Sequence, residues 1–262
     1  HSPAAEVDAE DAAESAGDDP LTLQEMLPDV PVAVTYSTAE QTYFAGRYDE
    51  AAAMFSVYSE RHPENTWGHY MRGLALWKAN RDAEAVEALE QALALKADHL
   101  KSLVNLARVQ LELDRPDDAL ASIESALDVA PDNVDARRVL GRVYHELGRL
   151  EDAAAAYGEA LRLRSDDAWS LNNLALVRIE QDDHAAALPA LARAVELAPE
   201  VAVIRNNLGT ALECTGHLAQ AREQFLLAAD LGSARGELSL ARLDEVEIPA
   251  ADAVADLGAL AA

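Results

Sequence analysis

The side chains best suited to catalysis or metal binding are seven histidines and a single cysteine. His62 and His69 form the closest histidine pair, but no acidic third ligand stands at a spacing diagnostic of a metal site. Cys214 alone can form neither an internal disulfide nor a thiolate metal site. Glycine-rich phosphate loops, paired-cysteine zinc spacings, a His-Glu-x-x-His motif and a nucleophile elbow are all missing from the sequence. We therefore expect no enzymatic activity, no metal and no cofactor.

The charge of the chain limits its partners. Acidic residues outnumber basic residues by 47 to 21, which gives a formal net charge of −26. Such a molecule is repelled by phosphate backbones and by anionic lipid surfaces, so nucleic acid is excluded as a partner. No stretch approaches the roughly 20 apolar residues that a membrane-spanning helix needs, so we expect no direct membrane insertion.

A repeat of 34 residues fills the middle of the chain. One column of it holds a small residue, another holds alanine, and a third holds a bulky residue. The small column is Gly73, Ala107, Gly141, Ala175 and Gly209, the alanine column is Ala92, Ala126, Ala160, Ala194 and Ala228, and the bulky column is Phe55, Leu89, Ile123, Tyr157, Leu191 and Phe225.

Each unit has the pattern of two helices joined by a tight turn. In the third unit, apolar residues recur at helical spacing from Leu103 to Leu113, are interrupted at Asp114, and resume from Leu120 to Leu127. Small residues in one column let two helix axes approach to roughly 8 to 10 Å, and the bulky column fills the space between them. A single unit cannot bury its apolar face alone, but stacked units can.

This hairpin, with Leu140-Gly141, Tyr144, Ala153, Tyr157 and Ala160, resembles the tetratricopeptide repeat. The resemblance implies an all-α fold, a right-handed α-solenoid (superhelix) of antiparallel helix pairs. Six copies are expected within residues 32–235, at 32–65, 66–99, 100–133, 134–167, 168–201 and 202–235. Pro189 departs from the family pattern, and we expect its helix either to bend there or to start late.

The flanks differ from the repeats. Residues 1–20 are acidic and we expect a disordered spacer, followed by a short helix or extended arm over 21–31. Thr22 to Glu25 and Ser37 to Glu40 are candidate capping boxes, the second opening the first repeat. A capping helix over 236–248 and a flexible tail over 249–262 complete the predicted organisation.

In the tetratricopeptide family the first helix of each pair lines the concave groove. The resemblance therefore implies a partner-binding surface on the first helices, with its residues taken from fixed places in each unit. The candidates are Trp67, Tyr70, Met71, Trp77, Lys101, Asn105, Arg108, Arg138, Arg142, His145, Trp169, Asn172, Asn173, Asn206 and Asn207.

Three groups of candidates each have an internal alternative. The arginines 108, 138 and 142 suit an acidic or carboxylate-terminated partner, or they pair internally with Glu112, Asp135 and Glu146. The asparagines can grip the backbone of an extended peptide, as in the asparagine ladder of O-GlcNAc transferase, or they can bond between neighbouring helices. Trp67, Tyr70 and Trp77 form an apolar partner pocket, or they belong to the core.

The sequence thus favours a noncatalytic scaffold that binds a partner peptide or helix in its groove as part of a larger assembly. The alternative is a self-assembling structural protein whose groove is occupied by a neighbouring copy or by its own acidic N-terminal arm. The chaperone-binding carboxylate clamp is not matched, because Tyr36 and Glu40 stand where lysine and asparagine are needed. Eighteen arginines against three lysines suggest a GC-rich bacterial gene, and we expect a periplasmic location, with a cytoplasmic one as the alternative.

Overall fold

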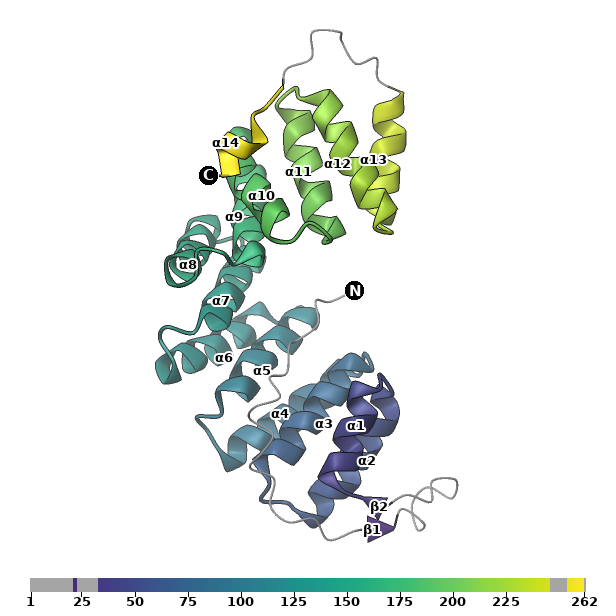
Figure 1. Cartoon of the computed structure of the whole chain (residues 1–262). Helices are drawn as coiled ribbons and strands as arrows, with labels where there is room; N and C mark the ends of the chain where they lie inside the picture. Colours follow the sequence, from purple (N-terminus) through teal and green to yellow (C-terminus); the bar gives the residue numbers. More distant parts are fainter. Residues whose placement is uncertain (1–20, 23–32, 246–253, 262) are drawn as a thin grey trace. The chain divides into compact units, whose positions relative to one another are not determined.

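A computed structural model describes residues 21–22, 33–245 and 254–261 of the 262-residue chain. The described residues contain fourteen helices, and the first twelve form six successive pairs (Figure 1). The pairs are α1 (Tyr36–Phe44) with α2 (Tyr48–Arg61), α3 (Thr66–Lys78) with α4 (Asp82–Leu95), α5 (Leu100–Glu112) with α6 (Pro116–Val129), α7 (Val134–Glu146) with α8 (Leu150–Leu163), α9 (Ala168–Glu180) with α10 (His184–Leu197), and α11 (Ala202–Cys214) with α12 (Leu218–Asp230). The fold is the predicted all-α array of helix pairs.

Two further helices and two short strands flank the pairs. Helix α13 (Ala234–Asp244) packs on α12, and the short α14 (Leu257–Ala261) packs on α10. Strands β1 (Leu21–Thr22) and β2 (Ala33–Val34) pair antiparallel, with Leu21 opposite Val34. Within the described ranges, no helix combines the length and the apolar character needed to cross a bilayer.

The chain divides into two compact units, residues 1–129 and 130–262. The core of the first unit is rich in aromatic residues, with Tyr36, Phe55 and Tyr58 in edge-to-face contact at ring-centroid distances of 5.6 Å. The core of the second unit is mainly aliphatic around Phe225. Each unit is therefore held together by its own buried side chains.

The columns of the repeat pack as the sequence predicts. A Cβ added to Gly141 would lie 2.6 Å from the Tyr157 ring, and one added to Gly209 would lie 2.5 Å from the Phe225 ring. Glycine is required at both places because the bulky ring of the second helix lies directly on the backbone of the first helix.

The turn inside each pair repeats as strictly as the helices do. The backbone has positive φ at one place in every pair, 34 residues apart. Only residues that tolerate this left-handed conformation occupy it, and they are Gly46, Asn80, Asp114, Gly148, Asp182 and Gly216.

The predicted start of the first helix is displaced by two residues. The capping box lies at Thr35 and Thr38 and not at Ser37 and Glu40. The Thr35 hydroxyl accepts a hydrogen bond from the Thr38 N–H at 3.1 Å, and the Thr38 hydroxyl accepts one from the Thr35 N–H at 2.9 Å. Thr35 is the N-cap because its extended backbone directs its hydroxyl at the free amides of the first turn.

The flanks differ from expectation in part. Residues 1–20 and 23–31, including most of the expected arm, lie outside the described residues, and Thr22 belongs to a strand. The helix expected over 236–248 begins two residues earlier, because Ser233 caps it through the Gly236 N–H at 3.0 Å. Within the expected flexible tail, residues 254–261 instead form a segment with a helical turn against α10, because their leucines find an apolar surface there.

Pro189 lies inside α10, five residues after the first residue of the helix. The expected late start is therefore not observed. The N-terminus of the helix is fixed by Asp183, whose carboxylate accepts a hydrogen bond from the Ala186 N–H at 3.1 Å.

Candidate functional site

The fifteen predicted site residues lie on α3, α5, α7, α9 and α11, the first helices of their pairs, and we call them together the first-helix face. They divide by exposure into two classes. The partly exposed class is Trp67, Lys101, Arg108, Arg138, Arg142, His145, Trp169 and Asn173, and the buried class is Tyr70, Met71, Trp77, Asn105, Asn172, Asn206 and Asn207.

In the first unit the aromatic candidates pack mainly on one another and on the core. Tyr70 is 2% exposed and Trp77 is 9% exposed, and both belong to the buried cluster. The half-buried Trp67 ring meets the rings of Tyr70 and His99 edge to face, at 5.5 and 4.8 Å. The Lys101 ammonium lies 5.5 Å from the Trp67 ring centroid, within cation–π range. Tyr70 and Trp77 thus lie in the hydrophobic core, as the second of the two hypotheses for the aromatic candidates predicts.

Asn105 lies in a short polar chain in the same unit. Its Nδ2 donates to the Tyr70 hydroxyl at 3.1 Å, and its Oδ1 accepts from Arg108 Nη1 at 3.2 Å. Burial raises the pKa of Tyr70 well above its ordinary value, so its hydroxyl stays protonated at neutral pH. Asn105 therefore links α3 to α5 and holds Arg108.

Arg138 in the second unit is paired internally, in agreement with the internal alternative. Its guanidinium donates to both carboxylate oxygens of Asp167 at 2.7 and 2.9 Å, and to Asp135 at 2.5 Å. Asp167 is also the N-cap of α9, where it accepts from the backbone and hydroxyl of Ser170. Burial alone would raise the pKa of Asp167, but the Ser170 hydrogen bonds and the Arg138 charge outweigh it and lower that pKa.

The other basic candidates lie in different surroundings. His145 Nε2 lies 2.6 Å from the Glu180 carboxylate, which links α7 to α9. Arg142 is half-buried on α7, and its charge acts against the rise that burial causes in the pKa of Tyr157. Arg108 belongs to the first unit and Arg142 to the second.

Asparagines of the second unit form a hydrogen-bonded row across α9 and α11, in which Asn172 and Asn207 are buried and Asn173 is partly exposed. Asn207 Nδ2 donates to Asn172 Oδ1 at 2.8 Å, and Asn172 Nδ2 donates to Asn173 Oδ1 at 3.1 Å. Asn206 is 3% exposed, and its Oδ1 has no hydrogen-bond partner among the described residues. Bonding between helices thus accounts for Asn172 and Asn207, whereas Asn206 keeps a buried acceptor unused.

The capping role of Asp167 is not among the sequence predictions. The 34-residue register would have shown it, because Asn65 and Asn133 occupy the same place and also cap their helices through their side chains. Metal binding has no support within residues 21–22, 33–245 and 254–261, where no three histidine, cysteine or acidic side chains gather into a possible site.

A model of the tetratricopeptide repeat matches residues 41–99, 104–168 and 172–236, well over half of the chain. The chain belongs to the tetratricopeptide repeat family. A search of curated protein sequences found no match. The membership agrees with the helix pairs, the small and bulky columns, and the left-handed turn position described above.

Several solved tetratricopeptide structures share the fold. A thermophilic tetratricopeptide protein from Thermus thermophilus is 22% identical and superposes with a TM-score of 0.61, covering 70% of this chain and all of that one. Pseudomonas aeruginosa PilF is 22% identical with a TM-score of 0.62, covering 69% of this chain and 83% of its own. YrrB, described as a tetratricopeptide protein with an unusual peptide-binding site, is 19% identical with a TM-score of 0.53, covering 73% and 98%. At these identities the similarity concerns the fold.

Proposed function

We propose that this tetratricopeptide protein is a noncatalytic scaffold that binds an extended partner peptide across α7, α9 and α11 of its second unit. The family membership supports a protein-interaction role. The finer assignment rests on one observation, the buried and unused Oδ1 of Asn206. Leaving a polar atom buried without a partner costs about 1 to 3 kcal/mol, so a ligand N–H that reaches it recovers that free energy.

The neighbours of Asn206 suit a peptide backbone. The asparagine row has its internal bonds in place, so its side chains are held in position before a ligand arrives. A peptide N–H donated to Asn206 would add to this row without reading the peptide side chains. Such binding would depend on the shape of the peptide backbone more than on the peptide sequence.

The proposed partner is acidic or ends in a carboxylate. Arg142 contributes a half-buried guanidinium on α7, and a carboxylate can accept two parallel hydrogen bonds from such a group. Arg138 is a poorer partner for a carboxylate, because Asp135 and Asp167 already neutralise it. The proposal assigns the partner carboxylate to Arg142, whose charge also acts on Tyr157 within the same unit.

The experiment selects peptides from a phage-displayed random library on the purified full chain and measures their affinities. Asn206→Leu should weaken the selected peptides at least tenfold while leaving the melting temperature unchanged or higher, because it removes a buried unsatisfied acceptor. Arg142→Glu should weaken acidic peptides by a similar factor.

Asn105→Leu is the matched control. It removes an asparagine from the first unit together with its two internal hydrogen bonds, so it should lower the melting temperature without changing peptide affinity. Unchanged affinity in Asn206→Leu, or a loss in Asn105→Leu as large as that in Asn206→Leu, would contradict the proposal.

A further inference from the structure

The C-terminal segment, residues 254–261, is seated on the second helices of the second unit. Helix α14 packs on α10, and Leu257 and Leu260 contact the aliphatic core of that unit. On α12, the Gln220 side chain binds the backbone of Ala255 twice. Its Nε2 donates to the Ala255 carbonyl at 2.9 Å, and its Oε1 accepts from the Ala255 N–H at 2.6 Å. One amide thus holds a single residue of an incoming segment without using its side chain.

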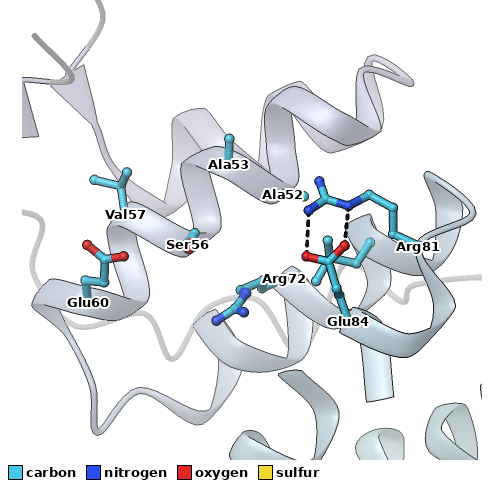
Figure 2. Close-up of a pocket in the computed structure, with 9 residues that line it drawn as sticks. Ala52, Ala53, Ser56, Val57, Glu60, Arg72, Arg81 and Glu84 are labelled. Atoms are coloured by element: carbon cyan, nitrogen blue, oxygen red, sulfur yellow. Dashed lines mark hydrogen bonds and ion pairs between the residues drawn. The ribbon is translucent and has the colours of Figure 1, made fainter. Parts of the chain in front are cut away.

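The repeat places an equivalent surface in the first unit, four repeats earlier. Gln220 corresponds to Glu84, and His217 corresponds to Arg81. Leu188 of α10 corresponds to Ala52 of α2, and Leu212 of α11 corresponds to Leu76 of α3. The residues at these places in the first unit belong to the lining of a pocket of about 260 Å³. Figure 2 draws this lining, which also includes Ala53, Val57, Glu60 and Arg72.

The pocket has an apolar part and a polar rim. Ala52, Val57 and Leu76 supply the apolar contacts. On the rim, Arg81 donates two hydrogen bonds to Glu84, at 2.8 and 2.7 Å, as Figure 2 shows. This ion pair offers N–H donors and carboxylate acceptors side by side, the two functions that the Gln220 amide provides in the second unit.

Four lining positions differ in charge between the two surfaces. Arg81 and Glu84 replace His217 and Gln220, and Val57 replaces Arg193. Arg72 stands where Leu208 stands in the second unit. Its guanidinium is half-buried, and its hydrogen bond to Gln91 is long, at 3.3 Å. The first-unit pocket therefore suits a segment that resembles residues 254–261 but presents a carboxylate toward Arg72.

We propose that this pocket is a docking site for a partner protein's segment, namely a short leucine-bearing helical turn that is preceded by one extended residue and carries a carboxylate. The proposal does not depend on the peptide site proposed above, which lies on the first helices of the other unit. The occupant belongs to a different protein and not to a second copy. Each copy's own segment is already held by Gln220, and tethering makes that intramolecular contact strongly competitive.

The test uses a fluorescein-labelled, C-terminally amidated peptide with the sequence of residues 250–262, which has the required leucines and carboxylates. Its affinity for the full chain is measured by fluorescence anisotropy. We expect saturable binding at one site. Ala53→Trp, which fills the pocket, should weaken binding at least tenfold, and Arg72→Glu on the rim should weaken it at least fivefold.

The matched control is Ala155→Trp, which places the same ring at the equivalent position of α8. It should leave the affinity unchanged. In a second variant, Leu257→Asp with Leu260→Asp should detach the chain's own segment from α10. Any binding of the peptide to the freed α10 surface can then be measured. If Ala53→Trp does not fold, Arg72→Glu still tests the pocket, because residue 72 lies on the rim. The melting temperature of this variant is compared with that of the wild type.

Four results would overturn the proposal. The first is no saturable binding up to about 1 mM peptide, a concentration near the effective concentration of a short tether. The second is binding that Ala53→Trp and Arg72→Glu both leave unchanged. The third is binding that appears only after Leu257 and Leu260 are replaced, which would assign the peptide to the second unit. The fourth is concentration-dependent self-association that Ala53→Trp abolishes, which would assign the pocket to a second copy of this chain.

Discussion

At the scale of single residues, many polar groups of the first-helix face bind neighbouring residues of the protein. Arg138, Asn105 and His145 each hold a neighbouring helix through a hydrogen bond or ion pair. Asn172 and Asn207 are buried and bonded across two helices, whereas the buried Oδ1 of Asn206 has no hydrogen-bond partner in the described part of the chain. The residue types were visible in the sequence, but their partners were not, because residues 29 to 35 apart meet only after the helices pack.

Asp167 gives a prediction for acid stability. Its pKa is lowered in the folded state, so its contribution to stability is present above the ordinary aspartate pKa, near 3.9, and is lost as the pH falls through the lowered value. Asp167→Asn keeps the helix cap but removes the charge that pairs with Arg138. We expect it to reduce the free energy of unfolding by about 1 to 3 kcal/mol at pH 7.

Chemical denaturation at several pH values checks this. The difference between Asp167→Asn and the wild type should shrink below about pH 4, because the wild-type carboxylate then takes up its proton. A constant difference down to about pH 2 would show that the lost charge is not responsible. Asp166→Asn is the control, since that neighbouring side chain is exposed.

At the scale of helices, the sequence predicted the elements well and their ends less well. The 34-residue columns predicted each pair, because burial forces the small and bulky positions to recur. The start of the first helix was wrong by two residues, since Thr35, Ser37 and Thr38 are all adequate caps and only the local backbone selects among them. The packing of residues 254–261 was not predicted, because this segment lies outside the 34-residue register. The contact also depends on Gln220, which in the sequence resembles an ordinary surface glutamine.

The small column gives a prediction about helix packing. Gly141→Ala should reduce the free energy of unfolding by about 1 to 3 kcal/mol, because the new methyl group collides with the Tyr157 ring. Gly141→Ala combined with Tyr157→Leu should recover most of the loss, since Ala175 and Leu191 form such a pair in the next repeat. Urea denaturation measures both.

Gly158→Ala is the control for the same substitution. A Cβ at Gly158 meets no atom within 4 Å, so this change should be neutral or stabilising by up to about 1 kcal/mol. Equal losses in Gly141→Ala and Gly158→Ala would mean that the ring contact does not set the cost.

At the scale of the whole molecule, the dominant feature is the net charge of −26. Many exposed ion pairs join residues three apart, such as Arg115 with Asp118 and Arg149 with Asp152. Each such pair contributes only about 0 to 1 kcal/mol, whereas the excess of acidic groups repels itself throughout the fold. Repulsion should therefore outweigh attraction between surface charges.

Added salt tests that balance. Raising NaCl from about 0.01 to 0.15 M shortens the screening length from about 30 to 8 Å. We expect the melting temperature to rise by about 2 to 6 °C, because screening relieves the net repulsion more than it weakens the exposed pairs. Calorimetry at neutral pH checks this, and a lower melting temperature in salt would show that the ion pairs dominate.

The paired hydrogen bonds between Gln220 and the Ala255 backbone also govern how this protein can be lengthened or shortened. Four second helices open with an arginine that pairs with an acid three residues later, at Arg47, Arg81, Arg115 and Arg149. The last two open differently, and the chain end folds back over them. Whole repeats could therefore be inserted or deleted before residue 168 without removing the contact between Gln220 and residues 254–261. A truncation after residue 201 would remove both Gln220 and the segment that it binds.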